Sequence, residues 1–187
     1  KFWQKSQYAQ AVPQAIGVVG WKNSGKTTLI AHLIPALRAQ GFSVSTVKHV
    51  HHSIDLDQPG KDTFVHREAG AVDVVMYSEK RWAMLHERTD ATAAPLVLTD
   101  ILRRLSPVDL VLLEGFKSIP IPRIEIRAGD EVAPIRQSPD TNILAVVSDG
   151  TPDPDVPTFR RDDVNALADF IGGLLRARSL NWSGGST

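Results

Sequence analysis

The stretch GWKNSGKTTL, residues 20–29, most strongly constrains what this chain can fold into. A short apolar run, Ile16–Val19, precedes it, and a helical pattern over 27–40 follows it. The run has too few polar residues to leave one face in water, so we expect a buried strand. Gly41 is a suitable stop for the helix. The apolar residues at helical spacing are Leu29, Ile30, Leu33, Ile34 and Leu37.

The loop between this strand and this helix matches the pattern G-x-x-x-x-G-K-S/T through Gly20, Gly25, Lys26 and Thr27. Glycines permit backbone angles that aim successive N–H groups at one anion. The N-terminus of the helix adds the positive end of its dipole. We expect Lys26 to reach the β- and γ-phosphates of a nucleotide and the Thr27 hydroxyl to hold Mg²⁺. The alternative is a chance loop-to-helix turn, but the flanking strand and helix favour a P-loop.

A P-loop site also needs an acidic residue near the metal ion, usually at the end of a neighbouring apolar strand. The apolar run 108–113 ends in Glu114 and Gly115. We expect Glu114 to touch Mg²⁺ directly or through water, and Gly115 to let the backbone approach the γ-phosphate. Asp109, at the other end of the run, is expected to be a solvated strand start.

A polar stretch over 49–67 shows no periodicity, and a loop of this length in a compact domain is usually functional. We interpret its first part as a switch loop beside the phosphates, in which Asp55 or Asp57 orients water or joins the Mg²⁺ shell. A transition-metal site is the alternative. We favour the switch loop because no thiolate or fixed third ligand is evident. The histidines that raise the alternative are His49, His51 and His52.

The remaining patterns predict an α/β fold. Strands that alternate with helices indicate a mainly parallel sheet, and the run 72–86 adds an antiparallel hairpin. The fold class is therefore a P-loop NTPase, with a mainly parallel sheet flanked by helices and an added antiparallel hairpin. Asp162 or Asp163 is expected to cap the last helix. The other predicted elements are strands over 42–48, 108–113, 123–127 and 143–147 and a helix over 95–105.

Length, charge and composition narrow the class of protein. The 187 residues fit one α/β domain, placed at 15–178 between a leader or fusion segment, 1–14, and a tail or linker, 179–187. The formal net charge of zero provides no basic field for nucleic acid or an anionic membrane. No apolar run approaches the roughly 18–20 residues that span a bilayer. The absence of cysteine excludes disulfides and thiolate metal sites and is compatible with a reducing cytoplasm, the expected location.

These segments together resemble the MobB family, the GTP-binding adapters of molybdopterin-guanine dinucleotide biosynthesis. The likeness extends from about residue 16 to residue 171, so it covers nearly the whole core. The P-loop alone is generic, and its combination with the HxHHxxDxDxPGKD and EGFK runs is far more specific. The matching segments are GWKNSGKTTL, LIPALRAQG, VKHVHHSIDLDQPGKDT, REAGA, KRWAMLHE, DLVLLEGFK and DDVNALADF.

The resemblance implies GTP and Mg²⁺ binding, weak GTP hydrolysis, and a homodimer formed through extended sheets. It also implies assistance to a MobA-type molybdenum cofactor guanylyltransferase, with molybdopterin or its guanine dinucleotide as a further ligand. The catalytic candidates carried onto this chain are Lys26, Asp55, Asp57 and Glu114, and the metal ligands are Thr27, Asp55 and Glu114. The nucleotide-binding candidates are Gly20, Trp21, Lys22, Asn23, Ser24, Gly25, Lys26, Thr27, Thr28, Lys61, Gly115 and Asp149.

Guanine selection is not explained by a known motif, because the Asn/Thr-Lys-x-Asp pattern of GTPases is missing. Asp149 follows the strand 143–147, where that motif belongs in chain order. A carboxylate there can accept hydrogen bonds from the guanine N1–H and N2–H₂ groups. An ordinary strand-end turn at Asp149–Gly150 is an equal alternative.

Some P-loops carry an extra lysine directly after the first glycine. Here Trp21 holds that place and Lys22 follows, so we assign Lys22 no cross-dimer role.

Three functions fit the motifs. The first is a GTP-dependent adapter that hydrolyses GTP slowly, because no sequence pattern aims Arg67, Arg160 or Arg161 at the phosphates and an arginine finger is worth about 10³–10⁵ in rate. The second is a small-molecule kinase with a lid over 88–94. The third is a metallochaperone GTPase that uses the histidine cluster. We favour the first.

Overall fold

The computed structural model describes residues 12–50, 59–87, 97–128 and 142–180. The chain divides into two compact units, which are described separately. The larger unit comprises Lys1–His49 and Val97–Thr187, and the smaller unit comprises Val50–Leu96. Within the described ranges, no helix is long and apolar enough to cross a membrane.

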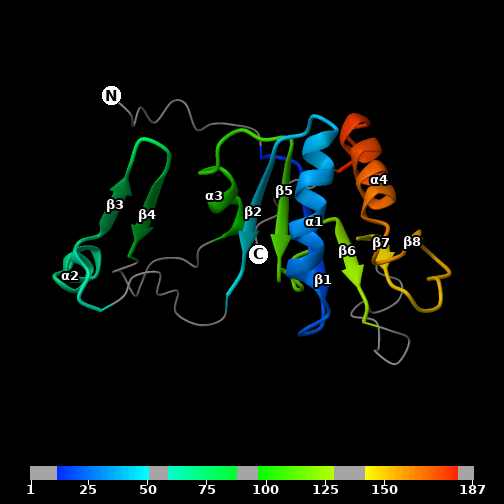
Figure 1. Cartoon of the computed structure of the whole chain (residues 1–187), viewed down its shortest axis with the longest axis horizontal. Coiled ribbons are helices and arrows are strands. Elements are labelled where there is room, and N and C mark those ends of the chain that lie inside the picture. Colours follow the sequence, from blue (N-terminus) through cyan, green and yellow to red (C-terminus); the bar gives the residue numbers. More distant parts are fainter. Residues whose placement is uncertain (1–11, 51–58, 88–96, 129–141, 181–187) are drawn as a thin grey trace. The chain divides into compact units, whose positions relative to one another are not determined.

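A parallel sheet forms the centre of the larger unit (Figure 1). In the described residues its strand order is β2-β5-β1-β6-β7-β8. The paired strands all run parallel, as the predicted alternation of strands and helices requires. The strands are β1 (Ala15–Gly20), β2 (Val44–Lys48), β5 (Leu110–Glu114), β6 (Arg123–Ile126), β7 (Ile143–Val147) and β8 (Thr158–Phe159).

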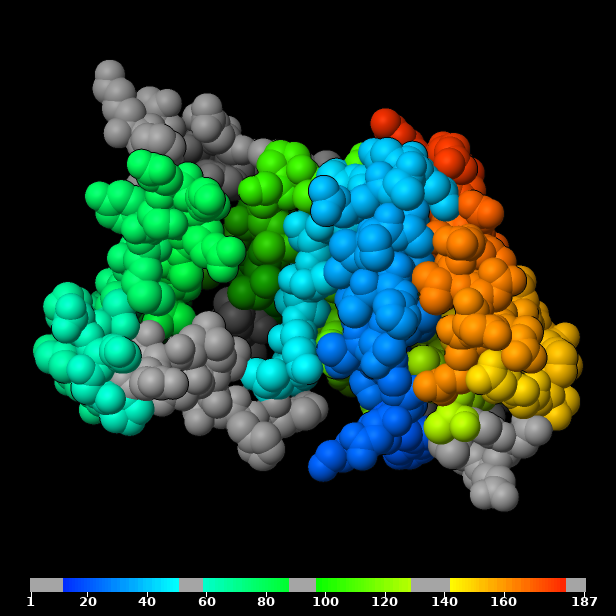
Figure 2. Space-filling model, in the orientation of Figure 1, coloured from blue at the N-terminus to red at the C-terminus, as the bar shows by residue number. Residues whose placement is uncertain are grey.

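Helices cover both faces of this sheet. On one face α1 (Lys26–Ala39) and α4 (Val164–Arg176) pack against each other and against alternate residues of the central strands. Figures 1 and 2 show these two helices side by side on the visible face. On the other face α3 (Leu98–Leu102) packs against the remaining side chains of β1 and β5. Because β1 and β5 are covered on both faces, they are apolar at nearly every position, which explains their continuous hydrophobic runs.

The ends of α1 and α4 follow the predicted signals. The α1 residues that face the core are the predicted ones, with Leu29, Ile30, Leu33 and Leu37 buried. Asp163, one of the two predicted caps, begins α4, and its carboxylate accepts a hydrogen bond from the Ala166 N–H at 3.2 Å. Because β1 and β5 run parallel, their carboxyl ends lie at one edge of the sheet, and α1 begins there, directly after the loop that follows β1.

The smaller unit consists of a helix and a hairpin. Helix α2 (Asp62–Glu68) precedes strands β3 (Asp73–Tyr77) and β4 (Trp82–His86), which pair antiparallel. Of its described hydrophobic residues only Val74 is buried, so this unit has little core of its own. Several of its apolar side chains are exposed, with exposed fractions of 86% for Tyr77 and 68% for Trp82.

Three details differ from the sequence-based expectations. The prediction of an unstructured stretch over 49–67 is wrong from residue 62 onward, where α2 forms although its apolar pattern is too short to be seen. The predicted antiparallel hairpin is confirmed, and it pairs as a separate two-stranded sheet. The helix expected over 95–105 is confirmed only over Leu98–Leu102. The two-residue strand β8 was not predicted, because it is too short to show alternation.

Candidate functional site

The loop between β1 and α1 lies at the carboxyl edge of the sheet. Two of its residues are left-handed, with φ of 62° at Asn23 and 95° at Gly25. Such residues let successive main-chain N–H groups converge on one side of a turn, as an anion-binding loop requires. Figure 2 shows the loop as dark blue atoms that project from the lower edge of the unit. Its exposed residues are Trp21, Lys22 and Asn23.

Both glycines of the motif are required by their surroundings. A Cβ on Gly20 would lie 2.7 Å from Cγ2 and 2.8 Å from the carbonyl oxygen of Ile126 on the neighbouring strand β6. A Cβ on Gly25 would lie 2.6 Å from Nη2 of Arg161. At Gly20 the loop is therefore pressed closely against β6, and a side chain there would force it outward. At Gly25 the neighbour is the end of a flexible side chain, so an added Cβ would displace the Arg161 guanidinium.

Lys26, the first residue of α1, folds back over the loop. Its ammonium group donates hydrogen bonds to the carbonyl oxygens of Gly20 at 3.1 Å and Trp21 at 2.7 Å. Burial lowers the pKa of Lys26, and the positive charge of Lys117 lowers it further. The negative charge of Glu114 opposes this shift. The Lys26 ammonium is thus held at the loop in a surrounding that favours an additional negative charge.

Glu114 meets the P-loop threonine. The Thr27 hydroxyl donates to Oε1 of Glu114 at 3.0 Å, and the Lys48 ammonium lies 3.3 Å from the same oxygen. The Glu114 side chain is only 14% exposed. A hydroxyl and a carboxylate at this separation are hard oxygen ligands of the kind that Mg²⁺ binds beside substrate phosphates. The donor set present here therefore fits a nucleotide-bound magnesium ion.

Asp149 lies across the loop from this pair, at the end of β7. Its Oδ1 accepts a hydrogen bond from the main-chain N–H of Arg161 at 3.1 Å. The guanidinium of Arg161 donates to the carbonyl oxygens of Ser24 at 2.8 Å and Arg127 at 2.9 Å. The candidate base-reading carboxylate and the phosphate loop are therefore both attached to one residue, Arg161.

A buried ionic cluster supports this side of the site. Nη2 of Arg127 donates to Glu125 at 3.0 Å and to Asp153 at 2.8 Å, and both carboxylate side chains are 1% exposed. Burial lowers the pKa of Arg127, but the hydrogen bonds to the two carboxylates outweigh it and raise the pKa above its ordinary value. Arg127 therefore stays charged, and its carbonyl is held in place for Arg161.

The other predicted site residues lie at varied places: Gly115 and Thr28 directly follow Glu114 and Thr27, while Lys61 does not belong to the same unit. Gly115 directly follows β5 with φ of 96°, and a Cβ there would lie 3.3 Å from the carbonyl oxygen of His49. Lys61 belongs to the smaller unit, where it is exposed at the start of α2. Thr28 is exposed in the first turn of α1. The predicted residues outside the described ranges are His51, His52, Asp55 and Asp57.

Asp109 is exposed at the start of β5, but it is more than a solvated strand start. Its Oδ2 accepts hydrogen bonds from Oγ of Ser43 at 2.6 Å and from the Ser43 N–H at 2.7 Å. These bonds hold the pKa of Asp109 below its ordinary value. The carboxylate joins the chain before β2 to β5, at the edge of the sheet opposite the loop.

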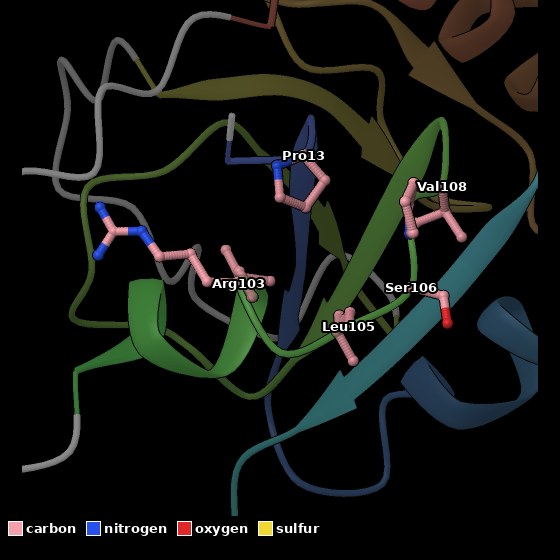
Figure 3. Close-up of a pocket in the computed structure, with 7 residues that line it drawn as sticks. Pro13, Arg103, Leu105, Ser106 and Val108 are labelled. Atoms are coloured by element: carbon pink, nitrogen blue, oxygen red, sulfur yellow. The ribbon is translucent and has the colours of Figure 1, made fainter. Parts of the chain in front are cut away.

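A small hollow lies at that opposite edge as well (Figure 3). Its volume is about 90 Å³, well below the roughly 300–1,000 Å³ of ordinary ligand pockets. The hollow is lined by Pro13, Leu102, Arg103, Leu105, Ser106, Pro107 and Val108.

Among the described residues, no group of three or more His, Asp or Glu side chains is placed to hold a metal ion.

Sequence reasoning did not place at the loop three basic residues that the structure brings there, although it considered Arg161 as an arginine finger. These are Lys48, Lys117 and Arg161. Lys48 and Glu114 are register partners on neighbouring strands, and this pairing depends on a strand order that the sequence does not reveal. Lys117 lies in the EGFK run, three residues after Glu114, so the motif itself carried a usable signal.

Comparisons with known proteins agree with this geometry. The family model for MobB, molybdopterin guanine dinucleotide synthesis protein B, matches residues 15–149. The chain is 38% identical over 157 residues to a molybdopterin-guanine dinucleotide biosynthesis adapter protein of Escherichia coli, covering 83% of this chain and 90% of that protein. It is 35% identical over 160 residues to the protein of the same description from Haemophilus influenzae, covering 86% and 88%.

Solved structures give the same result for the fold. The chain superposes with a TM-score of 0.62 on a crystal structure of molybdopterin-guanine biosynthesis protein B, at 32% identity, covering 87% of this chain and 99% of that one. A MobB homolog from Bacillus stearothermophilus gives a TM-score of 0.61 at 25% identity, covering 88% and 99%. None of these relatives is named as a kinase or a metallochaperone, so the two alternative functions receive no support.

Proposed function

Because the chain belongs to the MobB family, we propose that it is a GTP-binding adapter with weak GTPase activity in molybdopterin-guanine dinucleotide biosynthesis. The observation that carries the nucleotide part is the contact between the Thr27 hydroxyl and Glu114 at 3.0 Å, beside the loop to which the Lys26 ammonium is bonded. It joins the phosphate loop to the acidic strand end, as a magnesium-dependent nucleotide site requires.

The residues of the loop divide the work of binding. The main-chain N–H groups around Gly25 and the Lys26 ammonium bind phosphate oxygens, while Thr27 and Glu114 hold Mg²⁺. The metal ion, when bound, neutralises charge on the phosphates. Asp55 and Asp57 remain candidates for orienting water or joining the metal shell, and Lys61 remains a candidate contact to phosphate or cofactor.

Hydrolysis at this site is slow. The three arginines considered as fingers are each engaged by protein groups: Arg161 donates to the Ser24 carbonyl, Arg160 pairs with Asp162, and Arg67 pairs with Glu87. An arginine finger contributes about 10³–10⁵ in rate. A site that lacks this contribution turns over slowly and suits a carrier or adapter better than a metabolic enzyme.

Guanine is selected by Asp149. Its carboxylate is half exposed: Oδ1 accepts from the Arg161 N–H and Oδ2 lies 3.9 Å from Nε of Arg161, so acceptor capacity remains for a base. Guanine offers two donors, N1–H and N2–H₂, to such a carboxylate, whereas adenine has no matching pair. The half of the site that binds phosphate does not distinguish the bases.

The smaller unit forms a homodimer contact. Its hairpin exposes apolar side chains on consecutive positions, including Val75 at 53% and Met76 at 40% beside Tyr77 and Trp82. A two-stranded sheet is marginal in water unless more strands or a second layer cover it. A second copy of the chain supplies that cover through paired hairpins. Sedimentation velocity measures this, and Tyr77→Lys with Trp82→Lys is expected to yield monomers.

The protein partner is a MobA-type molybdenum cofactor guanylyltransferase in the cytoplasm, with molybdopterin or its guanine dinucleotide present in the complex. The adapter binds GTP and the partner transfers GMP, so both proteins use the same nucleotide. This shared nucleotide is the chemical reason for the two proteins to bind each other. Affinity capture of purified guanylyltransferase, with and without GTP, tests this partner.

Titration calorimetry with Mg²⁺ tests the nucleotide proposal. We expect GTP to bind more tightly than ATP, Lys26→Ala to lose binding while its thermal unfolding stays unchanged, and Asp149→Ala to reduce the ratio of GTP to ATP affinity. Retained GTP affinity in Lys26→Ala would contradict the proposed phosphate site. An unchanged ratio in Asp149→Ala would remove Asp149 from base recognition.

A further inference from the structure

The ammonium group of Lys117 lies against the phosphate loop. Its Nζ is 4.9 Å from the centroid of the Trp21 ring, a cation–π separation. Trp21 is 48% exposed on the loop, and Lys117 is also exposed, so the pair faces solvent. The contact joins a residue beyond the end of β5 to the residue that follows the first glycine of the motif.

The main chain of Lys117 is fixed in this position. Its N–H donates to the carbonyl oxygen of Gly115 at 3.0 Å, and its own carbonyl accepts a hydrogen bond from Nη1 of Arg123 at 2.6 Å. Arg123 is buried in β6, next to β1. The turn that carries Lys117 is thus anchored to the strands that carry the loop, and the side chain does not approach Trp21 from a freely moving segment.

Trp21 holds two ammonium groups at once. Its carbonyl oxygen accepts from Lys26 at 2.7 Å, and its ring carries Lys117. The positive charge of Lys117 is the largest charge contribution, after burial, to the lowered pKa of Lys26. Among the described residues Lys117 has no carboxylate partner, whereas Lys48 pairs with Glu114. The ammonium groups of Lys26 and Lys117 therefore repel each other at one exposed loop, and an anion bound between them would offset this repulsion.

We propose that Lys117, seated on the Trp21 ring, is a second phosphate-binding cation that makes the site prefer a nucleoside triphosphate to a diphosphate. This inference rests on the proposed nucleotide binding and deepens it. An ammonium group has three donors, so it can remain over an aromatic face while it donates to a phosphate oxygen. Trp21 occupies the place where some P-loops carry an extra lysine, and here the cation at that place comes from the end of β5 instead.

Calorimetric titrations of GTP and GDP with Mg²⁺ test the inference. We expect Lys117→Gln to weaken GTP binding by about 10- to 100-fold, as for loss of a charge-assisted hydrogen bond, and to weaken GDP binding by less than about 3-fold. Lys117→Arg is expected to retain most of the GTP preference, since arginine keeps the charge and also stacks on tryptophan. Arg38→Gln is the matched control: it removes the same charge from an exposed position at the far end of α1, about 18 Å from Lys26.

Variants of Trp21 test the positioning role. Trp21→Ala is expected to lower the ratio of GTP to GDP affinity as Lys117→Gln does, and the double variant is expected to show no further decrease, because both changes disable one contact. Trp21→Phe keeps an aromatic face and is expected to retain most of the ratio.

The outcomes separate the two proposals. If the unaltered chain binds GTP but Lys117→Gln leaves the ratio of GTP to GDP affinity unchanged, the role of Lys117 is refuted and nucleotide binding stands. Equal losses for GTP and GDP would also refute it, because the cation would not act on the terminal phosphate. If the unaltered chain binds neither nucleotide, both proposals fail.

Discussion

Replacement of Gly25 by alanine should show how strongly the Arg161 side chain restrains the phosphate loop. Gly25 has φ of 95° directly before α1, a left-handed conformation that L-residues with a Cβ rarely adopt. An added Cβ would also lie 2.6 Å from Nη2 of Arg161. The substitution therefore meets two separate costs, one in the backbone and one in the position of the guanidinium.

The structure sets the size of each cost. A left-handed alanine costs about 1–2 kcal/mol. The clash pushes away a guanidinium that donates to Ser24 at 2.8 Å and to Arg127 at 2.9 Å, and a charged hydrogen bond is worth about 1.5–3 kcal/mol. Because a flexible side chain can retain part of these bonds after moving, we expect Gly25→Ala to lower the free energy of unfolding by about 2–4 kcal/mol.

Urea unfolding of four proteins measures the two costs apart: the unaltered chain, Gly25→Ala, Arg161→Met and the double variant. In the Arg161→Met background no guanidinium opposes the Cβ, so alanine should cost only the backbone share, about 1–2 kcal/mol. Gly173→Ala is the control. Gly173 lies within α4, and a Cβ there meets nothing within 4 Å, so alanine should stabilise by about 0.8–1 kcal/mol.

One result would refute the reasoning. If Gly25→Ala destabilises by the same amount with and without the Arg161 guanidinium, then Arg161 does not press against the loop. A stabilising effect of Gly25→Ala, as expected for Gly173→Ala, would in addition contradict the left-handed conformation.

Three further predictions follow from the same contacts. Arg127→Met should lower the free energy of unfolding by about 3–5 kcal/mol in chemical denaturation, because it removes the guanidinium that pairs with both buried carboxylates; a loss below 1 kcal/mol would contradict the buried cluster. The lowered pKa of Asp109 stabilises the fold above its unfolded pKa of about 3.9, and this stabilisation disappears as pH falls through the folded value. Ser43→Ala should therefore flatten the acid limb of a melting-temperature profile, and an unchanged limb would refute the assignment. Chelation of Mg²⁺ should weaken GTP binding by the unaltered chain but should have little effect on Glu114→Gln, and an equal effect on both in calorimetry would exclude Glu114 from the metal shell.

The sequence alone determined the local elements whose signals lie close together in the chain. The G-x-x-x-x-G-K-S/T spacing placed the loop, the continuous apolar runs placed β1 and β5, and the Asp162–Asp163 pair placed the start of α4, where the structure selects Asp163 as the cap. The glycine spacing of the loop and the apolar run of a buried strand are both recorded in consecutive residues, so these features can be read without knowing which elements pack against them.

The tertiary structure decided which distant residues meet. Strand order puts β5 beside β1 and β2, and only this brings Glu114 to Thr27 and Lys48. The return of the chain after β8 carries Arg161 back to Ser24, although 137 residues separate them. Side-chain contacts across such separations depend on the packing of every element between them, and no local pattern records that packing. For this reason the phosphate loop could be predicted from the sequence, while the positions of Lys48 and Arg161 beside it could not.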